Sequence, residues 1–290
     1  MHNIKLFAFV ACLIWPATSV ISQDKESYRI YKGSGEQVEF GMMVSELGSN
    51  DVVLFGELHN NPIDHWLQLE FTKAVDVDHE IILGAEMFES DDQVVLDEYL
   101  AGKIKLDHLK KEAKVWPNYD TDYAPLVEYA KANNVAFIAT NVPRRYASLV
   151  SKDGIDALSE LSKEAKAFMP KVPYTVTEGD RGYEKMTTMM GAHGGGEGME
   201  KLIAAQALKD YTMAHFINEN LKKESVFIHF NGSFHSNDHS GIYNYLLAAN
   251  KKLKIGTIAA TEAETLDWND EWKDMGDYII VTPFSMTKTH

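Results

Sequence analysis

The stretch Val52-Val-Leu-Phe-Gly-Glu-Leu-His59 decides the fold, because its pattern returns far downstream in Val226-Phe-Ile-His-Phe-Asn-Gly-Ser-Phe-His235. Each stretch is a largely apolar run with β-branched and aromatic members that leads into Gly-x-x-His. Such runs are typical of buried strands in a largely parallel sheet. The repeated pattern therefore predicts two strands that each carry a histidine, His59 and His235, just beyond the carboxyl end.

A third apolar run, Ile81-Ile-Leu-Gly-Ala-Glu86, ends in a carboxylate, and Glu89 follows it. The carboxyl ends of parallel strands meet at one edge of an open α/β sheet, where ligands bind. We therefore expect two imidazoles and two or three carboxylates to converge there. The alternative is that Gly-x-x-His arose by chance, with each histidine a hydrogen-bonded structural residue. Two copies with acidic neighbours favour the functional interpretation.

Predicted strands and helices alternate along the chain. Asn61 is a natural N-cap and Pro62 follows it at the first helical position, which predicts a helix over 62–77. Apolar residues at helical spacing predict another helix over 199–222. This alternation predicts an α/β fold, a mostly parallel sheet with helices on both faces. We expect residues 23–290 to form one such domain, with a smaller helical lobe inserted at about 143–200. Further strands are expected at 80–86, 135–140, 254–260 and 278–282.

Residues 1–22 have the features of a signal peptide: a basic Lys5, an apolar stretch from Leu6 to Trp15, and small residues before Gln23. The apolar stretch has about ten residues, whereas a membrane span needs roughly 20. We therefore expect an exported protein, periplasmic or extracellular. A less favoured alternative is a lipoprotein signal, which would leave an acylated Cys12 as a membrane anchor.

The chain is strongly acidic, with a formal net charge of −15. Bulk electrostatics therefore do not favour binding to nucleic acid or to anionic membranes. Cys12 is the only cysteine, and it would leave with the signal peptide. A metal ion or haem would then have to be held by histidine, tyrosine, methionine or carboxylate side chains.

Two further segments carry candidate binding residues. Arg144 and Arg145 follow the strand 135–140, where a guanidinium would meet either an anionic ligand or the nearby glutamates.

The glycine-rich run 191–198 lacks the Gly-Lys-[Ser/Thr] of a phosphate loop. It predicts a mobile loop in which His193 closes over a ligand. Methionines before the run would line a pocket or fill gaps in the core; they are Met186, Met189 and Met190.

The helix expected at 199–222 has an apolar stripe that two polar residues interrupt, Gln206 and Asp210. Burying a carboxylate and an amide there costs several kcal/mol unless both find partners. They would either bond to a neighbouring loop or support the histidine and arginine groups at the sheet edge.

Six ordered motifs resemble the ChaN family of exported haem-binding proteins, within the Tiki-like superfamily that also includes erythromycin-esterase-like enzymes. The resemblance implies a parallel α/β domain with a smaller helical lobe and haem held by tyrosine, with a site between two protomers as one arrangement. The superfamily also contains metal-dependent peptidases and esterase-like enzymes with paired Gly-x-x-His motifs and glutamates. Their positions match Glu57, His59, Glu86 and His235. The motifs span about residues 40–260 and are Val53–Asn60, Gly84–Glu89, Trp116–Pro125, Asn141–Arg144, Ala205–Ala214 and Gly232–His235.

Our first hypothesis is an exported haem-binding protein that serves haem or iron acquisition. The candidate haem-contacting residues are Tyr174, Tyr183 and His193, and an apolar wall would bury the macrocycle. The expected partners are haem or another small molecule, a second copy of the chain, and an outer-membrane haem-uptake receptor.

Our second hypothesis is a metal-dependent hydrolase. His59, Glu86 and His235 would bind a divalent metal ion, and Glu57 or Glu89 would act as general base on a metal-bound water. Arg144 would stabilise the developing oxyanion. A third possibility is that the constellation is inherited architecture without remaining chemistry.

Overall fold

The computed structural model describes residues 25–191 and 196–290, so the expected signal peptide lies outside the described residues. Its centre is an eight-stranded sheet with the order β2-β1-β8-β7-β3-β6-β4-β5. The six strands from β8 to β5 are parallel, and the β1–β2 hairpin is antiparallel at one edge. The predicted mostly parallel sheet is thus confirmed. The strands are β1 Arg29–Lys32, β2 Gln37–Val38, β3 Val52–Glu57, β4 Glu80–Glu89, β5 Ala136–Asn141, β6 Ser225–Gly232, β7 Ile255–Ala263 and β8 Tyr278–Pro283.

Helices connect the strands, as the alternating pattern predicts. Within the described ranges, no helix combines the length and apolar character that a membrane span requires. The helices are α1 Phe40–Leu47, α2 Pro62–Asp76, α3 Gln93–Leu100, α4 Leu106–Glu112, α5 Ala124–Asn133, α6 Arg144–Asp153, α7 Lys163–Lys166, α8 Arg181–Gly191, α9 Glu197–Asn220 and α10 Ile242–Ala249.

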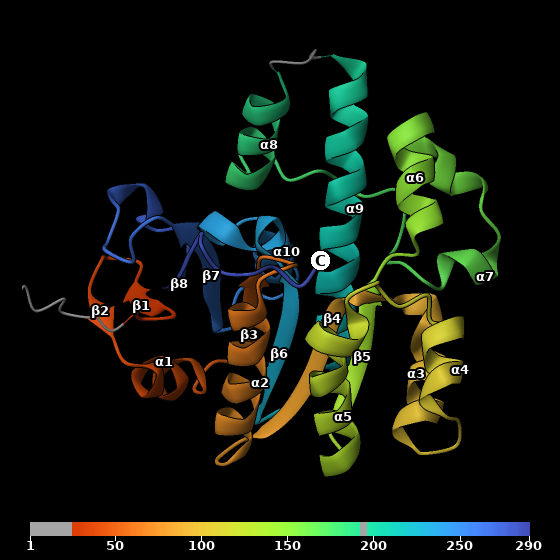
Figure 1. Cartoon of the computed structure of the whole chain (residues 1–290). Coiled ribbons are helices and arrows are strands. Elements are labelled where there is room, and N and C mark those ends of the chain that lie inside the picture. The colour runs from red at the N-terminus through yellow and green to blue at the C-terminus, as the bar shows by residue number, and fades with distance from the viewer. Residues whose placement is uncertain (1–24, 192–195) are drawn as a thin grey trace, which may run out of the picture.

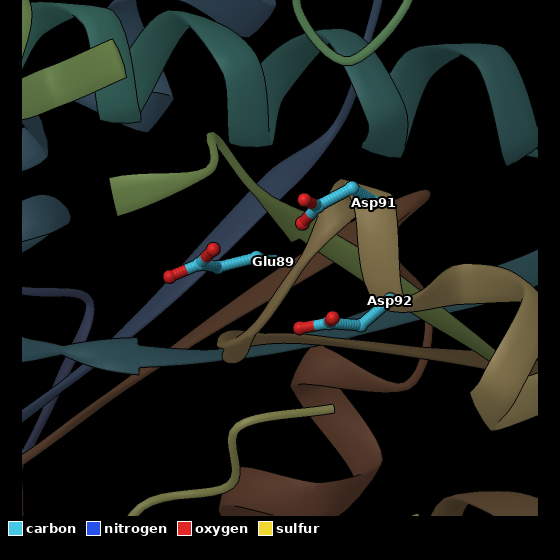
Figure 2. Close-up of side chains that lie close together, drawn as sticks. All are labelled: Glu89, Asp91 and Asp92. Carbon is cyan, nitrogen blue, oxygen red and sulfur yellow. The ribbon is translucent and has the colours of Figure 1, made fainter. Parts of the chain in front are cut away.

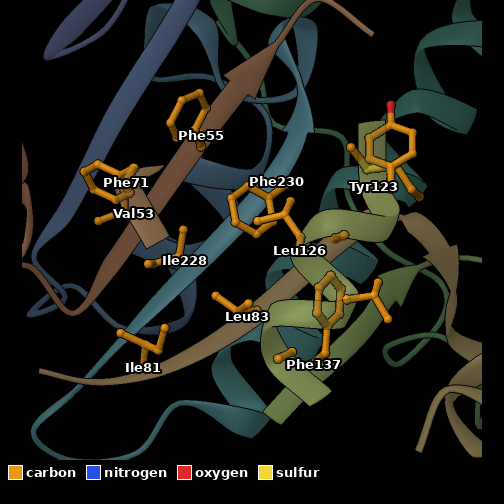
Figure 3. Packing of buried hydrophobic residues seen from close by; sticks show 14 of the residues in the cluster. Val53, Phe55, Phe71, Ile81, Leu83, Tyr123, Leu126, Phe137, Ile228 and Phe230 are labelled. Atoms are coloured by element: carbon orange, nitrogen blue, oxygen red, sulfur yellow. The ribbon is translucent and has the colours of Figure 1, made fainter. Parts of the chain in front are cut away.

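Alternate residues of the central strands bury opposite faces of the sheet. On β3, Val53 and Phe55 pack with Phe71 of α2 and with residues of α5 in one core (Figure 3). Val52 and Leu54 belong to a second core with Leu208 of α9 and residues of α10. Because successive strand side chains point to opposite faces, an unbroken apolar run is what a strand between two helical layers needs. The prediction of helices on both faces is confirmed.

The strand order opens a crevice at the carboxyl edge. β3 and β4 are consecutive along the chain, but β6 lies between them. Glu57 pairs in register with Gly232, and Ala85 pairs with Phe230, so the three strands end at a similar level. Such a break in sequential order is where open α/β sheets bind ligands. Figure 1 shows α6, α8 and much of α9 rising beyond the sheet in the upper half of the view.

Two local features add to the expected alternation of strands and helices. Residues 40–47 form α1 ahead of β3. α6 ends at Asp153, because Gly154 takes a φ of 88°, a left-handed conformation that ends a helix. The predicted inserted lobe at about 143–200 contains α6, α7 and α8, and its status as a separate lobe stays a prediction.

Gly84 allows β4 to lie against β6. A Cβ at Gly84 would lie 2.7 Å from the ring of Phe227, a fully buried side chain. We therefore expect Gly84→Ala to lower the free energy of unfolding by about 1–3 kcal/mol through overpacking, measured by chemical denaturation. The control is Gly41→Ala in α1, where a Cβ would meet nothing within 4 Å. Equal stability of the two variants would contradict this packing argument.

Candidate functional site

The carboxyl edge holds an open cleft of about 640 Å³. This volume falls within the range of small-molecule and cofactor sites, roughly 300–1,000 Å³. The cleft brings together five of the predicted site residues, although they are distant along the chain: Glu57, His59, Glu86, Tyr183 and His235. The polar side of the cleft includes Glu57, His59, Glu86, Gln206, Lys209 and His235.

His235 lies between two buried carboxylates. Its Nε2 is 3.0 Å from Oε1 of Glu86 on β4, and its Nδ1 bonds to Oδ1 of Asp210 on α9. Burial of the ring opposes its positive charge, but the charges of Glu86 and Asp210 outweigh burial and raise the pKa of His235 to about 10. The ring is therefore an imidazolium near neutral pH, with both N–H groups donated to carboxylates.

The surrounding groups complete this ion pair. The backbone N–H of Gly232 donates to Oε2 of Glu86 at 2.8 Å, and Tyr183 donates its hydroxyl to Oδ2 of Asp210 at 2.7 Å. Burial acts against the charge of Glu86, but the charge of His235 outweighs burial and lowers the pKa of that carboxyl. The predicted partners Gln206 and Asp210 both contact the His235 ring. These contacts tie α8 and α9 to the ends of β4 and β6.

A second carboxylate–imidazole pair lies beside the first. Glu57 is fully buried at the end of β3 and accepts hydrogen bonds from Tyr123 at 2.8 Å and from Gln68 at 2.5 Å. Its Oε1 is also 2.9 Å from Nδ1 of His59, which makes that nitrogen the donor. The His59 ring packs edge-on against Trp116, with centroids 4.9 Å apart.

His59 is much more accessible than His235. Its side chain is 41% exposed, whereas that of His235 is 6% exposed. Burial disfavours charge on His59, but the hydrogen bond to Glu57 and the charge of Glu86 raise its pKa. A Cβ on Gly232 would lie 2.7 Å from Nε2 of His59. The His59 ring therefore lies directly against the Gly232 backbone, at a distance that only glycine allows.

An apolar surface belongs to the same cleft. Met186 and Met189 come from α8, and Phe234 comes from the short turn after β6. Met189 and Phe234 are 64% and 60% exposed. The prediction that these two methionines line a pocket agrees with their positions, whereas the side chain of Met190 and the whole of His193 lie outside the described residues.

Glu89 and Arg144 are placed elsewhere. They line a second hollow of about 490 Å³ together with Lys114 and Trp116. Glu89 pairs with Lys114 at 3.0 Å. The two residues lie apart from His59 and His235. β4 has a register irregularity between Ala85 and Glu89, and α6 begins at Arg144. Both side chains therefore point away from the cleft.

An acidic cluster lies beside the second hollow. Within residues 25–191 and 196–290, one set of three potential metal-donor groups has its donor atoms within 4.8 Å of one another. Its members are Glu89, Asp91 and Asp92 (Figure 2). Lys114 pairs with all three carboxylates, at 3.0, 3.5 and 3.3 Å. Arg145 adds a bond to Asp91 at 2.6 Å. We interpret this cluster as an ion-pair network, since two basic side chains already neutralise most of its charge.

The two candidate haem tyrosines occupy different places. Tyr183 lines the cleft, but Tyr174 lines a separate hollow beside Ala204, whose carbonyl accepts its hydroxyl proton at 2.5 Å. Burial and the charge of Asp210 raise the pKa of Tyr183 far above the ordinary range. Its hydroxyl is thus held as a neutral donor.

Residues 284–290 return to the cleft after β8. The backbone N–H of Thr289 donates to the carbonyl of Asn60 at 3.1 Å, and its hydroxyl donates to Asp122 at 2.7 Å. These bonds place His290 among the residues that line the cleft. The tail is therefore attached to the loop that carries His59.

Sequence reasoning missed several contributors to the cleft. Lys209 follows Gln206 by three residues, so helical spacing would have placed both on one face. Tyr123 and Gln68 hold Glu57 through contacts that no local pattern encodes. Phe234, from the turn after β6, and His290, from the carboxyl-terminal segment, also line the cleft.

An open α/β sheet with a ligand-sized cleft at its carboxyl edge defines the class of protein. Residues 43–246 match the family described as haem-binding uptake, Tiki superfamily, ChaN. The match covers more than half of the chain, and the chain belongs to this family. The resemblance drawn from the motifs is therefore confirmed.

Solved structures and one curated relative extend the comparison. ChaN of Campylobacter jejuni, which binds heme cofacially, is 18% identical, with a TM-score of 0.68 over 89% of this chain and 97% of that chain. This likeness supports the fold. An erythromycin esterase, EreC, is 10% identical, with a TM-score of 0.44 over 82% and 77% of the two chains. Protein RETICULATA-RELATED 5, chloroplastic, of Arabidopsis thaliana is 30% identical over 156 residues, which are 49% of this chain and 21% of the plant protein.

The His235 ion pair predicts a pH-dependent stability. The pKa of His235 is raised from 6.5 to about 10, so its contribution is fully present below pH 6.5 and is lost as the pH rises through about 10. We expect His235→Gln to lower the free energy of unfolding at pH 7 by about 3–5 kcal/mol, because it leaves buried carboxylates without a cation. The deficit relative to the unsubstituted protein should shrink towards pH 10.

Chemical denaturation across pH 6–10 measures this effect. His108→Gln is the matched control, because the His108 side chain is 60% exposed on α4. We expect the control to follow the unsubstituted protein at every pH. A His235→Gln deficit that stays constant up to pH 10 would contradict the assignment of an imidazolium.

Proposed function

We propose that the protein is exported and binds haem in the cleft, in the service of haem or iron acquisition. The observation that carries the proposal is the combination of an apolar surface and an accessible imidazole, His59, in one cleft of about 640 Å³. Membership in a haem-binding uptake family supports it. The signal-peptide pattern of residues 1–22 supports export.

The residues of the cleft fit the chemistry of haem. Met186, Met189 and Phe234 offer apolar contacts to a macrocycle. Lys209, on α9, offers an ammonium group to a haem carboxylate. His59 offers a ring nitrogen, the kind of ligand that haem iron accepts. When bound, haem supplies an iron centre, and these side chains would hold it.

The exposed apolar rim supports a role for a second copy of the chain. Met189 and Phe234 stay largely exposed beside the cleft. Haem bound against them would still present an apolar face to water, and an equivalent face on a second protomer would cover it. We therefore propose a homodimer that forms around haem. A haem-uptake receptor in the outer membrane would be the partner that receives the cargo.

Titration of the purified protein with haem tests the proposed function. We expect a saturable shift of the Soret band and an increase in molar mass by light scattering. A spectrum that stays that of free haem at stoichiometric protein would contradict haem binding. Shifted absorbance without a change in mass would contradict the dimer alone.

The apolar rim gives a sharper prediction. Met189→Ser and Phe234→Ser should each weaken haem affinity by about ten- to a hundredfold, since burying one such side chain contributes about 1.5–3 kcal/mol. Their exposure makes a loss of folding stability unexpected. Met42→Ser is the matched control, because Met42 is 44% exposed on α1. Unchanged affinity in both rim variants would place haem outside this cleft.

A second candidate function is hydrolysis. The Glu57–His59 pair favours it, because a carboxylate that orients an exposed imidazole suits general-base catalysis. The metal-dependent form of this hypothesis has less support, since the donated N–H groups of His235 leave it no lone pair for a metal ion. Ester hydrolysis that is abolished in His59→Gln would support the candidate. Activity that is retained in this variant would exclude His59 as the base.

A further inference from the structure

Haem bound in the cleft needs a side chain that can donate to its iron, and this inference rests on the proposed function. The family resemblance implies a tyrosine. In the cleft, the tyrosine to consider is Tyr183. It donates its hydroxyl proton to buried Asp210 at 2.7 Å, and burial together with that carboxylate raises its pKa. Ligation as a phenolate would place a second anion beside Asp210, so Tyr183 is poorly suited to the task.

The Glu86–His235 pair is also occupied. Both nitrogens of His235 carry protons that they donate to Glu86 and Asp210. Both oxygens of Glu86 have donors, one from His235 and one from the backbone of Gly232. A metal bond to either residue would break this buried ion pair.

His59 is differently arranged. Its Nδ1 is committed to Glu57, a carboxylate that Tyr123 and Gln68 hold in place. This bond fixes the orientation of the ring and leaves the lone pair on Nε2. The side chain is 41% exposed and lines the cleft.

We infer that His59, through Nε2, is the iron ligand for haem in this protein, and that Glu57 is its positioning residue. A carboxylate that accepts the Nδ1 proton fixes the tautomer and raises the basicity of a ligating imidazole. It therefore strengthens the bond to ferric iron and lowers the reduction potential. The assignment replaces the tyrosine that the family resemblance implies with a histidine of the first Gly-x-x-His motif.

Haem-loaded variants test the ligand. We expect the unsubstituted protein and Tyr183→Phe to show an iron–histidine stretching band in the ferrous resonance Raman spectrum. His59→Gln should lose this band and bind haem at least about tenfold more weakly, and added imidazole should restore the band. His290→Gln, which removes another imidazole that lines the cleft, is the control and should retain the band.

Glu57→Gln tests the positioning role. We expect haem to remain bound with the iron–histidine band at a lower frequency and a higher reduction potential, because an amide polarises the imidazole less than a carboxylate does. Melting by circular dichroism verifies that the variant is folded. If Glu57→Gln does not fold, the His59→Gln and imidazole measurements decide the ligand alone, since His59 is exposed and its loss does not bury an unpaired group.

The outcomes separate this inference from the proposed function. Absence of haem binding by the unsubstituted protein would overturn the function. Haem binding with an unchanged spectrum in His59→Gln would leave the function intact and overturn the ligand. Loss of the spectrum in Tyr183→Phe, with retention in His59→Gln, would return the ligand to the tyrosine.

Discussion

The arrangement of the cleft depends on one buried ion pair, in which an imidazolium is shared by two carboxylates from different elements. Glu86 comes from the sheet and Asp210 from α9, and neither would remain charged in an apolar core without His235 between them. The pair therefore attaches the helical layer to the carboxyl edge of the sheet. Its stabilisation offsets the cost of three ionised groups that the fold removes from water.

The two Gly-x-x-His motifs have similar sequences and different physical roles. His235 is enclosed on both nitrogens and serves the architecture. His59 is bound on one nitrogen and faces the open cleft. The difference comes from the tertiary contacts of each motif. α9 passes over the second motif and supplies Asp210. Trp116 and the backbone of Gly232 border the first motif without closing it.

Much of the fold followed from local patterns, because apolar runs of strand length, the Asn61 cap and the helical stripe of α9 each reflect nearby residues. The same patterns predicted that residues 57, 59, 86 and 235 meet at one edge. They could not separate Glu89 and Arg144 from that group, since the strand irregularity after Ala85 and the start of α6 redirect those side chains. They also could not assign protonation, which depends on long-range partners such as Asp210 and Tyr123.

The return of residues 284–290 to the loop of His59 bears on how the protein should be prepared. Anything fused after His290 would begin at the mouth of the cleft, within reach of the open imidazole. A polyhistidine purification handle at that point would offer its own rings to haem and imitate a native ligand in any spectrum. A handle on the amino-terminal side, ahead of β1, approaches the sheet along its antiparallel margin and avoids that artefact.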